Sequence, residues 1–198
     1  MKIADRLLDF LPWALATLMI ATMVHLVSVL LMPTLAPKDA YARLTDYAKK
    51  TGIAEGLVML EPPSLGSAGV LPFEDPSFVE AACLYDISKR PYHLKASTDG
   101  DNFFALSFYA TGGRIYHAIT GRSAIKGKFD IILGNERQIE ALENASDGSA
   151  PVQEVRLTAP TSRGFIFIRA LAKRNSDVTH LQELLKNARC ENFELPKE

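Results

Sequence analysis

An uninterrupted apolar run from Phe10 to Met32 constrains this chain more than any other feature of its sequence. The run has no Asp, Glu, Lys or Arg. Its few polar residues are Thr17, Thr22, His25 and Ser28. A helix that crosses a bilayer needs roughly 20 such residues. We therefore expect one transmembrane helix here, ended by Pro33 and Pro37, which places the rest of the chain beside a membrane.

The same run has a second interpretation, as a cleaved secretory signal, because Lys2 and Arg6 precede it. The apolar core of a signal peptide is usually about 7–15 residues long, and this run is longer. The nearest small-x-small cleavage pattern lies at 40–42, beyond Lys38 and Asp39. We therefore favour an uncleaved anchor over residues 1–36.

Charge does not settle which side of the membrane the domain occupies. Lys2, Arg6 and the amino terminus lie before the run, and Lys38, Arg43, Lys49 and Lys50 lie after it. Counting these charges leans weakly toward a cytoplasmic domain.

His25 is the costly residue of the run, because an ionisable side chain in a membrane needs a polar partner. Two interpretations stay open. In the first, which we favour, the neutral imidazole is tolerated near the headgroups. In the second, His25 helps this helix to pair with a helix of a partner protein.

Composition limits the kind of domain that the anchor can carry. About 160 residues suit one domain with its own core. The formal net charge of −1 argues against nucleic acid as a partner. Cys83 and Cys190 show no C-x-x-C or zinc-ligand spacing, so no metal or cofactor is predicted. They are either two buried thiols of a cytoplasmic domain or, outside the cytoplasm, a disulfide.

The pattern of the remaining chain is mainly β. A juxtamembrane helix is expected within 37–56, with Gly52 as its stop. Helices are also expected after Asn135, where Gln138 completes a capping box, and over 177–189. Strands are expected at 57–60, 78–87, 92–96, 104–110, 114–119, 129–133, 152–158 and 164–171. The strand at 164–171 is apolar on both faces and therefore expected to be central.

Two hairpins are expected among these strands. One turns at Gly112-Gly113, and the other joins 152–158 to 164–171. Strands in succession with marginal helices predict an antiparallel β-sandwich or open barrel over residues 57–198, behind one N-terminal transmembrane helix.

Residues that carry chemistry are scattered. His93 and His117 lie on predicted strands and could meet across a sheet as a metal or acid-base pair, although ordinary strand positions are the favoured interpretation. Carboxylates at turns usually cap them, and the candidates here are Asp75, Asp86, Asp99 and Asp101.

The best concentration of recognition groups is the hairpin set Arg114, Tyr116, His117, Thr120, Arg122 and Ser123. From it we take Arg114, Tyr116, His117 and Arg122 as candidate ligand-binding residues, with a solvated hairpin face as the favoured alternative. No G-x-S-x-G elbow or phosphate loop is present, and no catalytic residue is predicted.

Several segments resemble a known bacterial family. They are the CLYD strand at 83–86, the turn at Pro91, the SFY strand with its glycine turn, the strand 163–171 and the final Cys190. Together they resemble the short, membrane-anchored members of the domain of unknown function 1254 family. The resemblance implies a β-sandwich outside the cytoplasm, which overrides the charge count and favours a Cys83–Cys190 disulfide.

In long relatives of that family a second sandwich, domain of unknown function 1214, comes next in the same chain. The present sequence has no such segment before Glu198, so a separate chain carrying it is an expected partner. We expect a non-catalytic accessory or partner-docking component of the bacterial cell envelope, anchored in the inner membrane with its C-terminal domain in the periplasm. The alternative is an enzyme or small-ligand binder with a polar site on the 104–123 hairpin.

Overall fold

A computed structural model describes residues 2–35, 39–53, 56–62, 69–72, 74–145 and 154–194. The chain divides into two compact units, Met1–Pro37 and Lys38–Glu198.

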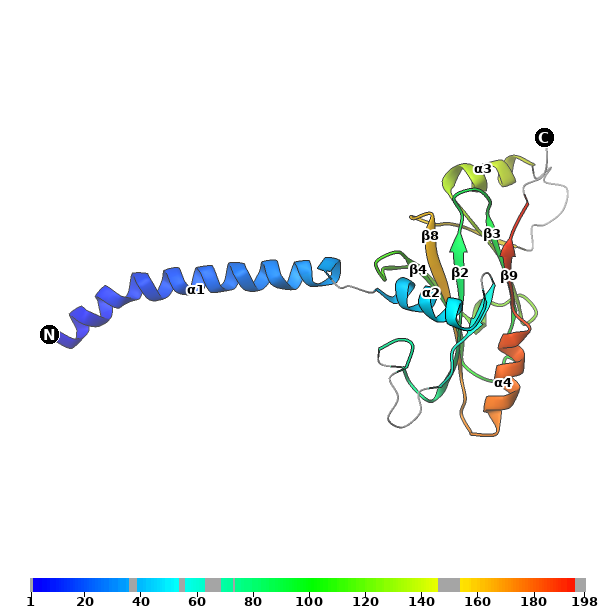
Figure 1. The fold of residues 1–198 in the computed structure, drawn as a ribbon, viewed down its shortest axis with the longest axis horizontal. Coiled ribbons are helices and arrows are strands. Elements are labelled where there is room, and N and C mark those ends of the chain that lie inside the picture. Colours follow the sequence, from blue (N-terminus) through cyan, green and yellow to red (C-terminus); the bar gives the residue numbers. More distant parts are fainter. Residues whose placement is uncertain are drawn as a thin grey trace. The chain divides into compact units, whose positions relative to one another are not determined.

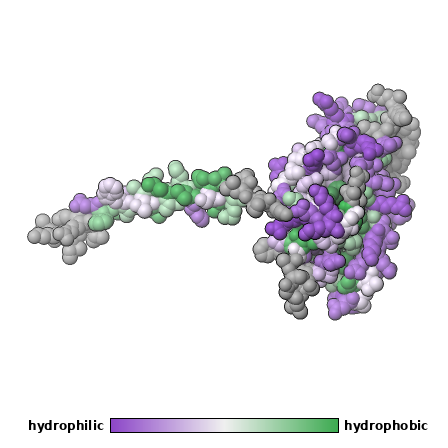
Figure 2. All heavy atoms as spheres, viewed as in Figure 1, coloured by the Kyte–Doolittle hydropathy of each residue, from purple (hydrophilic) through white to green (hydrophobic). Residues whose placement is uncertain are grey.

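The first unit is one helix, α1, which spans Lys2–Leu35. Its stretch Asp9–Met32 is long and apolar enough to cross a membrane. Large apolar side chains are exposed along this stretch, as Figure 2 shows. The hydroxyls of Thr17 and Thr22 donate to the carbonyls of Trp13 and Leu18, which removes much of their cost in an apolar surrounding.

The second unit is built on two β-sheets (Figure 1). The five-stranded sheet has the order β1-β2-β8-β4-β5. Its strands are β1 (Leu57–Met59), β2 (Phe78–Asp86), β8 (Arg163–Leu171), β4 (Phe104–Ala110) and β5 (Ile115–Thr120). The other sheet, of four strands, has the order β7-β6-β3-β9. Its strands are β7 (Val155–Thr158), β6 (Lys128–Gly134), β3 (Tyr92–Ser97) and β9 (Arg189–Asn192).

The main core lies between the inward faces of the sheets. Along β4, Phe104, Leu106 and Phe108 are buried and alternate with half-buried residues, the period expected of a strand with one face in the core. The Phe104 ring stacks on Phe129 of β6 with 5.5 Å between centroids. The prediction that the strand at 164–171 is central is confirmed, because β8 pairs with both β2 and β4.

Three α-helices complete the part of this unit that the structure describes. The first, α2 (Ala40–Lys50), packs Leu44 against Phe165 and Phe167 on the outward face of the five-stranded sheet. On the other sheet, α3 (Glu136–Ala145) covers Ile132. The last, α4 (Asp177–Lys186), buries its Leu181 and Leu185 in the main core.

Local hydrogen bonds set where these helices begin. Asp39 caps α2 by accepting from the Ala42 amide at 2.8 Å. The predicted capping box before α3 is confirmed, since Asn135 and Gln138 each accept the other's amide at 2.9 Å. Asp39 also accepts from the Gly112 amide at 2.9 Å, which ties the start of α2 to the turn between β4 and β5.

Two sequence predictions about pairing and length are wrong. The segment 152–158 does not form a hairpin with 164–171, because β7 lies parallel to β6 and α3 supplies the crossover that a parallel pair requires. Val152 and Gln153 lie outside the described residues. The final helix ends at Lys186 rather than 189, and β9 comes after it, paired with β3. The two sheets form a mixed sandwich that, over the described strands, does not close into a barrel.

We expect Gly164→Ala to lower the free energy of unfolding by about 1–3 kcal/mol. A methyl group at Gly164 would overlap the Tyr109 carbonyl oxygen and the Tyr85 hydroxyl, so the hydrogen bond between those two groups would have to move. Urea unfolding of the full chain in detergent measures the change. Gly121→Ala is the matched control, because its added methyl group meets only ordinary contacts. Equal unfolding midpoints for the two variants would contradict the prediction.

Candidate functional site

The hairpin that carries the candidate ligand residues forms as predicted. β4 and β5 pair antiparallel around Gly112 and Gly113, whose φ angles are +81° and +76°. Pairing shifts register by one residue, so Phe108 lies opposite His117 and Tyr109 opposite Ile115. Tyr116 is the extra residue of this β-bulge, a distortion that re-aims the side chain.

Tyr116 is directed into the sandwich and is not offered to a ligand. Its hydroxyl lies 3.2 Å from that of Tyr85, and the Tyr85 hydroxyl donates to the Tyr109 carbonyl at 3.1 Å. Burial raises the pKa of both phenols, and the mutual hydrogen bond raises the pKa of Tyr116 further. Both tyrosines therefore stay neutral and act as hydrogen-bonded core residues.

His117 lies on an open side of the sandwich, where β5 passes β6 and β7. A groove of about 370 Å³ is present there. Its apolar lining includes Ile119, Ile125, Phe129, Ile131 and Val155. Ile125 and Val155 are exposed, so the groove presents apolar surface to solvent.

The two arginines of the candidate set lie away from this groove's floor. Arg114 is exposed beside the turn, just before β5. Arg122 belongs to the short 3₁₀ helix η1 (Gly121–Ser123) and lines a separate cavity of about 540 Å³ with Thr98, Phe103 and Lys173. The structure therefore distributes Arg114, Tyr116, His117 and Arg122 along one strand and its ends, and does not bring them together in one pocket.

His93 and His117 do not meet. His93 alternates with Tyr92 and Leu94 of the core, so it lies on the outward face of the four-stranded sheet, where it pairs with Asp130. His117 lies opposite the core residue Phe108, on the inward face of the five-stranded sheet. Within the described residues, no group of three or more His, Cys, Asp or Glu side chains could hold a metal ion.

Three of the four candidate carboxylates cap turns, and the amide of the fourth, Asp101, donates to Asp99. Asp75, Asp86 and Asp99 accept backbone amides two or three residues further along the chain, from Ser77, Ser88 and Asn102 respectively. Hydrogen bonds from Ser88 and Arg163 lower the pKa of Asp86 to about 2. These contacts supply the turn-capping role that the sequence favoured, and Arg163 joins the start of β8 to the end of β2.

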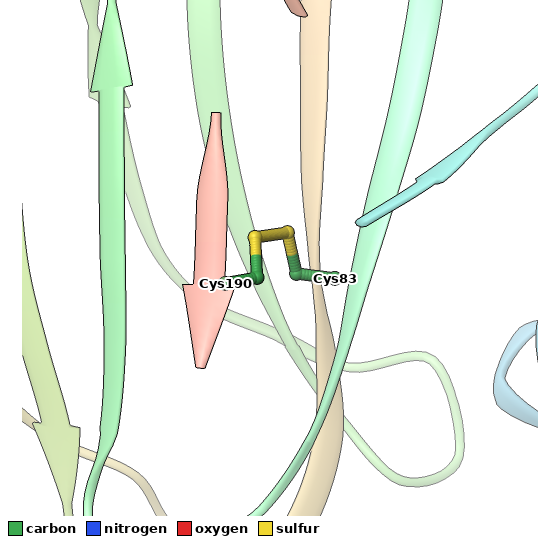
Figure 3. The surroundings of a disulfide bond; sticks show 2 residues. All are labelled: Cys83 and Cys190. Carbon is green, nitrogen blue, oxygen red and sulfur yellow. A yellow bond between two sulfur atoms is a disulfide. The ribbon is translucent and has the colours of Figure 1, made fainter. Parts of the chain in front are cut away.

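The structure joins Cys83 and Cys190 in a disulfide (Figure 3). Cys83 lies on β2 and Cys190 on β9, so the bond links the two sheets across the core. Their Cα atoms are 6.1 Å apart, and 107 positions separate them in the chain.

A family model described as "Protein of unknown function (DUF1254)" matches residues 75–192, which include both cysteines and the hairpin. The chain belongs to the DUF1254 family. The resemblance recognised in the sequence is therefore confirmed. No curated protein matches this DUF1254 chain.

A comparison with solved structures finds one whose fold is similar to that of this DUF1254 chain. The VPA0106 protein from Vibrio parahaemolyticus is similar, with a TM-score of 0.53 at 11% identity over 80% of this chain and 37% of that one. An uncharacterized protein from Burkholderia cenocepacia matches with a TM-score of 0.44 at 10% identity, over 82% of this chain and 45% of that one. The present chain thus spans less than half the length of either.

The sequence did not predict one feature of this DUF1254 chain, the ion pair between Glu80 and Arg169. They are cross-strand partners on β2 and β8, with Arg169 Nε 2.9 Å from Glu80 Oε1. Glu80 is only 5% exposed, and the Arg169 guanidinium lies 4.5 Å from the Phe78 ring centroid. Opposite charges on two separate strands give no signal until the pairing register is known.

Proposed function

We propose that this DUF1254 protein is held in a bacterial inner membrane by α1 and acts in the periplasm as a non-catalytic docking module of the cell envelope. The observation that carries the proposal is the Cys83–Cys190 disulfide combined with an apolar helix of membrane-spanning length. Disulfides persist in oxidising compartments and are rare in the bacterial cytosol.

The side of the membrane is inferred from the disulfide rather than from charge. Basic residues flank the apolar run Phe10–Met32 on both sides, so the positive-inside tendency is weak for this chain. The bond joins two buried cysteines and links both sheets, and a reducing compartment would work against it. This argument supports the periplasm over the cytoplasm.

Docking is the function that the geometry favours over ligand binding or catalysis. The four candidate residues do not share a pocket, and two polar side chains nearby, the buried Tyr85 and the half-buried Tyr116, hydrogen-bond to each other. The chain aligns with 37% of the longer VPA0106 protein. We propose a separate chain carrying the domain of unknown function 1214 sandwich as the partner.

The anchor makes a direct prediction. We expect the protein to remain in the membrane fraction after alkaline carbonate washing, and its intact mass to include residues 1–36. Protease added to spheroplasts should digest the domain, because the outer face of the inner membrane would then be accessible. A soluble product that lacks the apolar run would instead identify α1 as a cleaved signal, and a domain protected in spheroplasts would place it in the cytoplasm.

The docking role is tested by affinity purification of the full chain from gently solubilised membranes. We expect one companion protein to co-purify in an amount comparable to that of this chain. Mass spectrometry should identify it as a chain carrying the domain of unknown function 1214 sandwich. Recovery of the protein alone at several detergent and salt conditions would overturn the docking proposal.

A further inference from the structure

Strand β5 is an unusual edge. It spans Ile115–Thr120 and contains no Pro, Asp, Glu, Lys or Arg, residues that commonly protect an edge strand from pairing. Four of its six side chains are exposed. The other edge strands, β1, β7 and β9, have three or four residues each. Among the described strands, β5 is therefore the longest edge, and β4 is its sole sheet partner. The bulge at Tyr116 distorts only the start of this edge.

The bulge leaves a regular segment for pairing. Tyr116 is turned inward, and from His117 to Thr120 the register with β4 is uninterrupted. His117 and Ile119 lie opposite Phe108 and Leu106 of the core, so their side chains are on the inward face. Both line the apolar groove beside β6 and β7. A strand laid along β5 would cover this groove with every second side chain.

The rim of this open side is basic. Arg114 precedes β5, and Arg122, Lys126 and Lys128 come after it, all exposed. The carboxylate at the groove, Asp130, is engaged by His93. This local excess of positive charge belongs to a chain whose formal net charge is −1. A segment that binds here would gain from acidic residues at its ends.

We propose that the partner of this protein docks by adding an extended segment to β5 as a further strand of the five-stranded sheet. The segment alternates apolar and polar side chains, places the apolar ones over the groove, and carries Asp or Glu at its ends opposite Arg114 and Arg122. Backbone hydrogen bonds supply affinity in this mode, and the side chains over the groove supply specificity. The inference rests on the proposed docking function and names its surface.

The first test reverses the charge of the rim. In the full chain, Arg114→Glu/Arg122→Glu is expected to reduce co-purification of the companion about tenfold or more, because like charges would then face each other. The control is Lys95→Glu/Arg189→Glu, which makes the same charge change at two exposed residues of β3 and β9. We expect that control to retain the companion. Equal losses in both variants, or none in either, would overturn the proposal.

The second test uses a defined probe. The probe is a labelled synthetic peptide in which Val and Ile alternate with Thr, with two Glu residues at each end. It is titrated into the full chain in detergent, and binding is followed by fluorescence anisotropy. Binding should protect backbone amides of β5 from hydrogen exchange and weaken with added salt. A peptide of the same composition with its apolar residues clustered should bind at least tenfold more weakly. Equal binding of both peptides, or protection outside β5, would contradict strand addition.

The third test separates a partner from a second copy. A photo-reactive amino acid replaces Ala118, which is exposed at the middle of β5. Cross-linking to the companion recovered by affinity purification supports the proposal. A product of twice the chain's own mass would show self-pairing of β5 and overturn it. The control chain carries the photo-reactive residue at Lys95 instead of Ala118. If the companion co-purifies but cross-links only from Lys95, the docking function stands and β5 is refuted as its surface.

Discussion

Replacing Cys83 and Cys190 together with alanine is expected to lower the free energy of unfolding by about 2–5 kcal/mol. The bond closes a loop over a separation of 107 positions, so in the chain-entropy model it removes much of the conformational freedom of the unfolded state. It also holds β9, a strand of four residues, against the core. Urea unfolding of the full chain in detergent, followed by near-ultraviolet circular dichroism, measures the change.

Reduction provides the control for that prediction. In the native protein, a thiol reductant should lower the unfolding midpoint by as much as the double substitution does. In the Cys83→Ala/Cys190→Ala variant the same reductant should have no effect. Thiol labelling should detect both cysteines only after reduction and denaturation. Reactive thiols in the unreduced protein would remove the disulfide and, with it, the main support for a periplasmic domain.

Arg169→Met is also expected to have a large effect and to lower the free energy of unfolding by about 3–5 kcal/mol. The substitution leaves the carboxylate of Glu80 buried without its cation and removes the guanidinium from the Phe78 ring. Breaking one side of a buried pair is costly because the remaining charge is uncompensated. Arg169→Met/Glu80→Leu should recover most of the loss, since it replaces the pair with apolar groups.

The pH dependence of the stability of the Arg169→Met variant tests whether the uncompensated Glu80 charge causes its destabilisation. Burial raises the pKa of Glu80 above its ordinary value of 4.5, and Arg169 opposes that rise. Without Arg169 the pKa should rise further, so folding favours the protonated form. The penalty is then fully present above the folded-state pKa and shrinks as pH falls through it. The stability difference between wild type and variant should therefore be larger at pH 8 than at pH 5; equal differences would refute a role for the uncompensated charge.

Local patterns predicted most of the elements. The hairpin around Gly112-Gly113, the capping box of Asn135 and Gln138, and the apolar strand β8 all depend on residues near one another in the sequence. The pairing of β7 with β6 was not predictable in this way, because a hairpin with β8 satisfies the same local pattern. β9 was missed because its four residues carry no apolar alternation and are held by β3 and the disulfide.

The candidate site shows the same division. The sequence located its polar residues on β5 and at the ends of that strand, yet it did not reveal that the bulge turns Tyr116 into the core. Nor did it reveal that His93 and His117 lie on different sheets, His93 on an outward face and His117 on an inward face. One residue of register reverses the face of every later side chain in a strand. The groove beside β5 was likewise not predictable from the sequence, because its lining residues Ile125, Phe129 and Val155 come from separate segments.

By itself, the sequence determined the apolar helix of membrane-spanning length, the β-rich domain behind it, and membership of a family whose pattern spreads over that domain. Those properties arise from local composition and periodicity. Only the tertiary structure decided which strands are neighbours, that Cys83 faces Cys190, that Glu80 meets Arg169, and that β5 is left as an open edge. Each of these depends on contacts between residues far apart in the chain, and such contacts are set by packing of the whole domain.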